Sequence, residues 1–307
     1  MSARRVHIDT DPGMDDLLAL ALAFGSPELE VTGITTVAGN GALPIVTQNA
    51  RRFCALAERD VPLGVGAFAP LALTPIDAAH FHGKDGRRGA PLPELPDAPL
   101  APARDVLRQS LLSRQVEYVI ALGPLTNVAT LAVEDPKLFA NARVLWMGGT
   151  LGAGNVTPKA EYNAYADPRA LRLLLASGVR MRITGLEVTN RVTLDAGKVE
   201  SLALPETPRG KLVAALLRGL CDAERALSNA SRAVLHDPCT VAAAFAPELF
   251  TFAPRALEVS DREGAERGRI RARGDAAASA IEYAVDAKID ALRDLLVERV
   301  VRWAEAA

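Results

Sequence analysis

The sequence has the size and composition of a folded globular protein. It contains 307 residues, of which 49% are hydrophobic and 23% are charged, so it can bury a large core and is unlike a disordered chain. Lysine and arginine number 35 and aspartate and glutamate number 37, which gives a formal net charge of −2. Because nucleic-acid-binding proteins carry a basic excess, we expect no nucleic-acid partner.

The chain also lacks the signals of a membrane or exported protein. Its richest apolar run, residues 17–25, is about half as long as a transmembrane helix requires. The charged start, residues 1–5, leads into a short β-type segment rather than into the apolar region of a signal peptide. The three cysteines, Cys54, Cys221 and Cys239, show no metal-binding spacing. We therefore expect reduced thiols, no membrane partner and a cytoplasmic location.

Short β-branched segments alternate with helical patterns along the chain. Strands are predicted at residues 6–9, 31–37, 116–121, 143–147 and 179–183, and helices at residues 15–24, 45–58 and 125–134. This alternation predicts an α/β fold with a mainly parallel, Rossmann-like open sheet and helices on both faces. Residues 257–273 predict a β-hairpin, and residues 281–306 predict a strand and an amphipathic helix, which together form a small C-terminal β/helical extension. We expect a single domain over residues 1–307.

Two long segments interrupt this alternation. Residues 68–102 are rich in proline, glycine and alanine and contain His80 and His82, and residues 148–166 contain several glycines and asparagines. Loops of this length are uncommon in a compact domain unless they serve a function.

The most informative segment directly follows the first predicted strand. Residues 9–16, Asp-Thr-Asp-Pro-Gly-Met-Asp-Asp, place four carboxylates between the end of a strand and the start of a helix. Helix capping accounts for one or two of them. Four converging carboxylates would repel one another and raise each other's pKa. A hard divalent cation, Ca²⁺ or Mg²⁺, would relieve the repulsion because both ions bind oxygen ligands.

Further oxygen ligands are available elsewhere in the chain. Asp237 precedes a proline at the start of a predicted helical run, residues 240–245, where it either binds a cation or caps the helix. The turn at residues 121–127 follows a strand, and its backbone carbonyls either face the same crevice or belong to a plain strand–helix turn. Ligands of open α/β sheets bind at the carboxyl ends of the strands, which is where we expect the chemistry.

These motifs resemble the nucleoside hydrolase family, the inosine–uridine-preferring N-ribohydrolases. The resemblance covers residues 6 to about 245 with nearly constant spacing, and its motifs lie at residues 9–16, 37–40, 82–83, 123–127, 147–149, 154–155, 160–163, 167–168 and 236–239. It implies an enzyme that hydrolyses the N-glycosidic bond of ribonucleosides to free base and ribose with one Ca²⁺. It also implies a homodimer or homotetramer.

The resemblance implies a ligand set for the metal. The matching ligands are Asp11, Asp16, the main-chain carbonyl of Leu122, and Asp237. Asp9 matches a supporting carboxylate beneath the metal. Asp11 also matches the residue that takes a proton from the attacking water.

The resemblance also implies a set of substrate-binding residues. Asp15, Asn40 and Asn163 match the groups that hold the ribose 2′- and 3′-hydroxyls. Asn155 and Glu161 match the groups around the 5′-hydroxyl. Carboxylate and amide oxygens around the sugar would stabilise the oxocarbenium-like transition state of this hydrolysis.

Histidine is the residue type suited to protonating the departing base. His236 matches the proposed acid of the histidine-bearing members of the family, and His82 matches a second pocket histidine on a mobile loop. His7, inside the first predicted strand, is expected to be structural. Residues 216–235 contain no aromatic side chain, although purine-active members often carry tyrosines there, so the base preference stays open.

Two other functions share part of this pattern. A haloacid-dehalogenase-like Mg²⁺ phosphatase also places an Asp-x-Asp after its first strand, but residues 12–16 differ from the pattern of that superfamily. A non-catalytic nucleoside- or ribose-binding protein would keep the hydroxyl-binding residues and lose the water-activating carboxylate or the acid. Asp11 and His236 are both present, which favours an enzyme.

Overall fold

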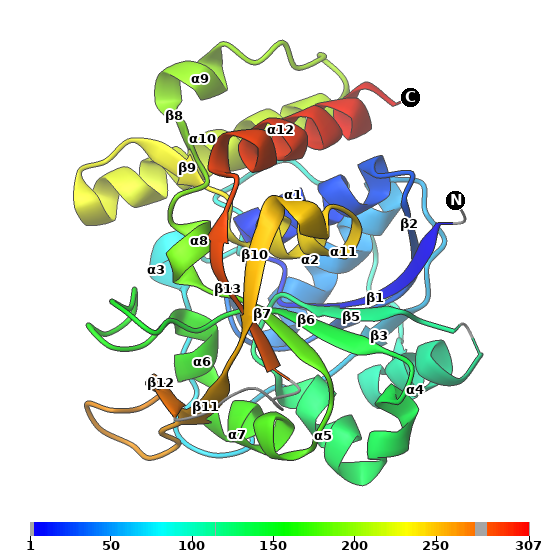
Figure 1. Cartoon of the computed structure of the whole chain (residues 1–307). Helices are drawn as coiled ribbons and strands as arrows, with labels where there is room; N and C mark the ends of the chain where they lie inside the picture. Colours follow the sequence, from blue (N-terminus) through cyan, green and yellow to red (C-terminus); the bar gives the residue numbers. More distant parts are fainter. Residues whose placement is uncertain (1–2, 114, 274–280, 307) are drawn as a thin grey trace.

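A mainly parallel sheet forms the centre of the computed structural model, which describes residues 3–113, 115–273 and 281–306 (Figure 1). Within these ranges the sheet contains nine strands in the order β10 (Phe250–Pro254), β13 (Ile281–Ala287), β7 (Met181–Thr184), β6 (Arg143–Met147), β5 (Tyr118–Ala121), β1 (Arg4–Thr10), β2 (Leu29–Thr36), β3 (Leu63–Val65) and β4 (Ala101–Pro102). All neighbours pair in parallel except β10 and β13, which are antiparallel at one edge. The predicted fold class is therefore confirmed.

The strand order reverses between β1 and β5. Strands β2 and β3 extend from β1 towards one edge, and β6 and β7 extend from β5 towards the other. Such a reversal opens a crevice at the carboxyl ends of the two central strands, because their connections leave in opposite directions. Asp11 directly follows β1 and Leu122 directly follows β5, so both residues lie at this crevice.

Helices cover both faces of the sheet (Figure 1). On one face α1 (Met14–Gly25), α2 (Leu43–Leu56) and α11 (His236–Phe245) lie against the sheet, and α10 (Pro208–Ser228) and α12 (Ile289–Glu305) pack outside them on α1. The other face packs against α4 (Ala103–Ser113), α5 (Thr126–Glu134) and α7 (Pro168–Ala176). Residues 14–23 of α1 are all buried, which is expected for a helix that is apolar on every side and enclosed by other helices.

Short elements connect these layers. They are α3 (Ala79–His82), α6 (Tyr162–Ala166), α8 (Leu186–Thr189), α9 (Ala196–Glu200), the 3₁₀ turns Pro136–Phe139 and Pro247–Leu249, and two small antiparallel pairs, β8 (Thr193–Asp195) with β9 (Arg232–Val234) and β11 (Ala256–Val259) with β12 (Ile270–Arg273). The pair β11–β12 is the predicted hairpin, and β13 followed by α12 is the predicted closing strand and helix. Residues 1 and 2, part of the predicted charged start, lie outside the described residues.

Sequence patterns missed α10, the longest helix of the described chain. Its start carries a recognisable signal, because Thr207 caps the helix by accepting from the Gly210 N–H and Pro208 occupies the first turn. The glycines inside it weaken the helical pattern. Within the described ranges, none of the helices combines the length and the apolar character that a bilayer crossing requires.

Phe53 links three helices of the larger core, and its truncation should destabilise the fold. Its fully buried ring stacks between Phe24 and Trp303, at centroid distances of 5.8 and 5.1 Å. We expect Phe53→Ala to lower the free energy of unfolding by about 3–5 kcal/mol in urea denaturation. The truncation would leave a cavity that the surrounding side chains fill only in part. Phe68→Ala is the matched control, since Phe68 is 81% exposed. This variant should change the free energy of unfolding by less than about 0.5 kcal/mol. Similar losses in both variants would contradict this account.

Candidate functional site

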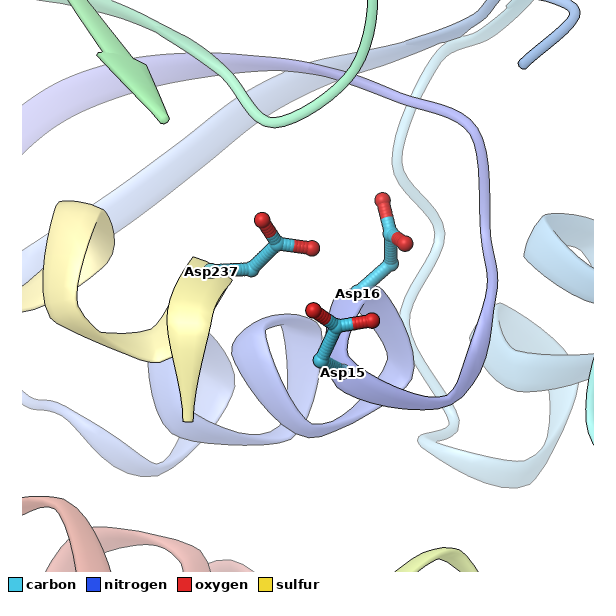
Figure 2. Close-up of side chains that lie close together, drawn as sticks. All are labelled: Asp15, Asp16 and Asp237. Carbon is cyan, nitrogen blue, oxygen red and sulfur yellow. The ribbon is translucent and has the colours of Figure 1, made fainter. Parts of the chain in front are cut away.

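Carboxylates from two helix starts meet at the crevice. Asp15 and Asp16 lie in the first turn of α1, and Asp237 lies in the first turn of α11. One oxygen of each lies within 4.8 Å of the others, and all three side chains are buried (Figure 2). The amino ends of both helices favour negative charge. Because α11 begins at His236, earlier than predicted, Asp237 does not cap the helix; the N-cap is Leu235.

Asp11 is enclosed between two glycines. A Cβ on Gly39 or on Gly123 would overlap the carboxylate oxygens of Asp11, so only glycine leaves room for this side chain. The Asn40 backbone N–H donates to Asp11 Oδ2 over 2.7 Å. Asp11 Oδ1 is buried and has no hydrogen-bond partner among the described residues, and the same is true of Asp15 Oδ1.

Asp16 is fixed by neutral donors. Its Oδ1 accepts from the Thr10 hydroxyl over 2.5 Å, and its Oδ2 accepts from the Gly13 N–H over 3.0 Å and from Asn40 Nδ2 over 2.8 Å. Asn40 therefore donates to two carboxylates at once, through its backbone to Asp11 and through its side chain to Asp16. These bonds hold the carboxylates in place and leave their charge uncompensated.

Asp9 supports the cluster from inside β1. Its Oδ1 accepts from Asn127 Nδ2 over 2.8 Å and from the Thr35 hydroxyl, and its Oδ2 has no partner among the described residues. Burial raises the pKa of Asp9 to about 6, against the effect of these two hydrogen bonds.

The carboxylates of the cluster repel one another, and this repulsion favours the binding of a cation. Burial, followed by repulsion from neighbouring carboxylates, raises the pKa of Asp15 to about 8 and those of Asp11 and Asp237 well above their ordinary value. Within the described ranges, none of these three carboxylates or Asp9 or Asp16 forms a salt bridge with lysine, arginine or histidine. Buried, unpartnered carboxylate oxygens beside a backbone carbonyl are the ligands that a hard divalent cation prefers, so the residues present fit such an ion.

A cavity of about 340 Å³ opens above the cluster. Most of the residues predicted from the sequence line it: Asp15, Asn40, His82, Leu122, Asn155, Glu161, Asn163, His236 and Asp237. Asp9, Asp11 and Asp16 are not part of this lining and lie behind it, fully buried. The structure thus brings the predicted substrate-binding residues, both predicted histidines and Asp237 to the wall of one pocket, and it buries Asp9, Asp11 and Asp16 behind that wall.

Several polar side chains of the pocket wall form hydrogen bonds with backbone groups of the protein. Asn163 Nδ2 donates to the Leu122 carbonyl over 2.7 Å and to the Met147 carbonyl over 3.0 Å, which joins the ends of β5 and β6. Glu161 caps α6 and accepts three backbone N–H groups, from Asn163, Gly149 and Ala164. Asn155 Oδ1 accepts from a backbone N–H in α6, so its amide NH₂ is the group left for a ligand.

Two of the three histidines that line the cavity, His82 and His236, are neutral at neutral pH. His82 Nδ1 accepts from the Met14 N–H over 3.1 Å, so its remaining proton is on Nε2. His236 Nδ1 pairs with the Thr189 hydroxyl over 2.8 Å. Burial lowers the pKa of His82 to about 3 and that of His236 to about 4. His7 is fully buried and bonded to two hydroxyls, as expected for a structural residue.

The aromatic surface of the pocket comes from segments other than residues 216–235. Phe81 in α3 and Tyr162 in α6 line the cavity, and the Tyr162 hydroxyl donates to the Gly39 carbonyl over 2.6 Å. Arg88 holds α3 in place, because its guanidinium donates to the Phe81 carbonyl over 2.5 Å and to the His80 carbonyl over 3.1 Å. Both aromatics lie in the two long interrupting segments, but a sequence pattern alone does not show that these loops fold over one pocket.

Comparisons with known proteins agree on one family. The family model described as inosine-uridine preferring nucleoside hydrolase matches residues 6–294. A pyrimidine-specific ribonucleoside hydrolase RihA from Salmonella agona (strain SL483) is 39% identical over 255 residues, which are 81% of this chain and 82% of the relative. A non-specific ribonucleoside hydrolase RihC from Klebsiella pneumoniae (strain 342) is 39% identical over 252 residues, 81% of each chain.

Solved structures give the same result. The plant nucleoside hydrolase PpNRh1 superposes with a TM-score of 0.90 at 30% identity, covering 97% of this chain and 99% of that one. A purine-preferring ribonucleoside hydrolase from Gardnerella vaginalis superposes with a TM-score of 0.91 at 27% identity, covering 99% of this chain and 100% of that one.

A calcium titration tests whether this cluster binds a divalent cation through Asp237. We expect Ca²⁺ added to chelator-treated protein, at about 100 times its Kd, to raise the free energy of unfolding by about 2.7 kcal/mol in thermal unfolding. Asp237→Asn should lose most of this gain. Its calcium-free form should be at least as stable as the wild type, because the change removes one of several mutually repelling buried charges.

The matched control for this test is Asp286→Asn. Asp286 is exposed and pairs with Arg191 at the surface, so this variant should keep the full calcium effect. An undiminished calcium effect in Asp237→Asn would contradict a metal site at Asp237.

Proposed function

The chain belongs to the inosine-uridine preferring nucleoside hydrolase family and is an enzyme of ribonucleoside hydrolysis; from this premise we propose that it cleaves the N-glycosidic bond with a Ca²⁺ ion, an aspartate base and a histidine that assists the departing base. The products would be the free base and ribose. Membership in this enzyme family excludes the two alternatives, a haloacid-dehalogenase-like phosphatase and a non-catalytic binding protein.

The observation that carries the proposal is the buried cluster of Asp15, Asp16 and Asp237 beside a ligand-sized pocket, next to unpartnered carboxylate oxygens on Asp11 and Asp15. Asp11, Asp16, Asp237 and the Leu122 carbonyl would hold the Ca²⁺, and Asp9 would support them from β1. Calcium accepts six to eight oxygen ligands in flexible geometry, which leaves positions for a diol and a water. When bound, the ion would orient the ribose diol and lower the pKa of its water.

Asp11 would act as the general base. Its Oδ1 is the oxygen without a hydrogen-bond partner, so it is available to take a proton from the attacking water. The bond from Asn40 to Oδ2 and the two flanking glycines restrict the carboxylate to one orientation. Such fixed placement of base and nucleophile lowers the entropic part of the barrier.

The pocket wall would bind the ribose. Asp15, Asn40 and Asn163 would hold the 2′- and 3′-hydroxyls beside the metal ligands, and Asn155 and Glu161 would hold the 5′-hydroxyl. Their place in the lining supports these roles, as does the unpartnered Oδ1 of Asp15, which can accept from a sugar hydroxyl. Negative and dipolar groups around the sugar also favour the positive charge that develops on it.

His236 would assist the base as it leaves. Its Nδ1 is bonded to Thr189, so Nε2 is the ring nitrogen available to a substrate. With the Thr189 hydroxyl as donor, the neutral ring carries its proton on Nε2 and can donate it towards the base. His82, whose proton is also on Nε2, would contribute a second donor from α3.

The remaining expectations concern the whole molecule. A single domain is supported by the pairing of β10 and β13, from the C-terminal part of the chain, into the same sheet as β1. The three cysteines are buried and free, which supports a reducing, cytoplasmic location. The homodimer or homotetramer stays a prediction from the family resemblance.

Replacing the proposed base should remove turnover and leave the fold intact. Asp11→Asn keeps the size of the side chain and loses its basicity, so we expect kcat to fall by about 10²- to 10⁴-fold, measured as reducing sugar released from inosine and uridine. Asp105→Asn, on the exposed face of α4, is the control and should leave kcat unchanged. A near-normal rate in Asp11→Asn would remove Asp11 from the role of base.

The proposed role of His236 predicts a dependence on the leaving group. We expect His236→Ala to slow inosine and uridine hydrolysis by about 10²-fold or more. The same variant should slow p-nitrophenyl riboside much less, because nitrophenolate is a stable anion that leaves without a hydrogen bond from His236. Release of base and of nitrophenolate would be measured in parallel, and an equal slowing of both substrates would contradict leaving-group assistance by His236.

A further inference from the structure

The outer end of the pocket contains an ion pair that the proposed mechanism does not use. Glu224 on α10 and Arg232 on β9 both line the cavity, together with Leu227 and Val234. An Arg232 guanidinium nitrogen lies 3.5 Å from Glu224 Oε1, which also accepts from the Ser228 hydroxyl over 2.8 Å. Among the lining residues that the structure describes, Arg232 is the one lysine or arginine.

The geometry of β9 places Arg232 beyond the sugar. Side chains two residues apart on a strand share a face and lie about 7 Å apart, so Arg232 and Val234 follow one another along the pocket wall. The chain then continues into His236 and Asp237 at the metal end. A ribose held at Asp237 would therefore extend its base past Val234, with the outer edge of the base at Arg232.

We propose that Arg232 binds the outer edge of the base and stabilises the negative charge that the base carries away, with Glu224 as the positioning residue that holds its guanidinium. This inference rests on the proposed function. When the C–N bond breaks, its electron pair stays on the base, the hydroxide of the water joins the anomeric carbon, and the water's proton passes to Asp11. A cation at the far edge of the base interacts more strongly with this transition state than with the neutral ground state, which is the condition for catalysis.

The same contact predicts which bases are preferred. A guanidinium has five N–H donors and no acceptor, so it pairs with an exocyclic carbonyl oxygen and not with an exocyclic amino group. An amino group could instead donate to Glu224, but that arrangement keeps a carboxylate beside the departing anion. The pair therefore favours bases with a carbonyl at the outer edge, and inosine over adenosine, which differ at this position.

Arg232→Met tests the proposal against a control on a neighbouring element. We expect kcat/KM for inosine to fall by about 10- to 100-fold, as for the loss of one charge-assisted hydrogen bond. Adenosine and p-nitrophenyl riboside should change far less, so the inosine-to-adenosine ratio falls. Arg232→Lys should recover part of the loss because it keeps the charge. Arg218→Met removes the same charge from α10, where Arg218 pairs with Glu200 outside the lining, and should leave inosine hydrolysis unchanged.

Two outcomes would overturn the role of Arg232. One is an equal loss on inosine, adenosine and p-nitrophenyl riboside, and the other is an unchanged inosine-to-adenosine ratio in Arg232→Met. If the wild type releases no base from any nucleoside, the proposed function fails, and calorimetry with free bases still tests the contact. In that experiment Arg232→Met should weaken the binding of hypoxanthine and not of adenine, and unchanged hypoxanthine binding would refute the contact.

Discussion

Repulsion among buried carboxylates is the constraint on which this site depends. Five aspartates lie at the carboxyl end of β1 and the starts of α1 and α11, and the described residues offer them hydrogen-bond donors but no cationic side chain. Hydrogen bonds fix the orientation of these groups, yet each carboxylate that is desolvated without a counter-charge lowers the stability of the folded state. The fold tolerates the arrangement because the surrounding core is large and because two helix amino ends face the cluster.

This constraint separates two kinds of polar group in the pocket. Glu161 and Asn163 use most of their hydrogen-bonding capacity on backbone groups and thereby join α6 to the ends of β5 and β6. Asp11 and Asp15 each retain an oxygen without a partner. The first kind shapes the wall, and the second kind is available for ion and substrate. A rigid wall around a few uncommitted oxygens is the arrangement that pre-organised catalysis requires.

The central part of this site could be predicted from the sequence because it depends on local patterns. Four aspartates between a β-branched strand and an apolar helix predict a cation site, and the rule that ligands bind at strand ends predicts where in the fold it lies. The outer pocket could not be predicted in the same way. Glu224 meets Arg232 because α10 packs beside the three-residue strand β9, and Phe81 reaches the cavity because Arg88 fastens α3. These are tertiary contacts between short or irregular elements, for which a sequence has no periodic signal.

The separation of Asp16 and Asp237 along the chain has a consequence for folding kinetics. Asp16 belongs to the first helix and Asp237 to the eleventh, so their meeting closes a loop that includes most of the polypeptide. Contacts of such long range form late, since the entropy of loop closure must be overcome first. An ion bound by both residues would link two segments that lie far apart in the sequence. Such an ion would lower the rate constant of unfolding much more than it raises the rate constant of folding. The native state would therefore have a longer lifetime.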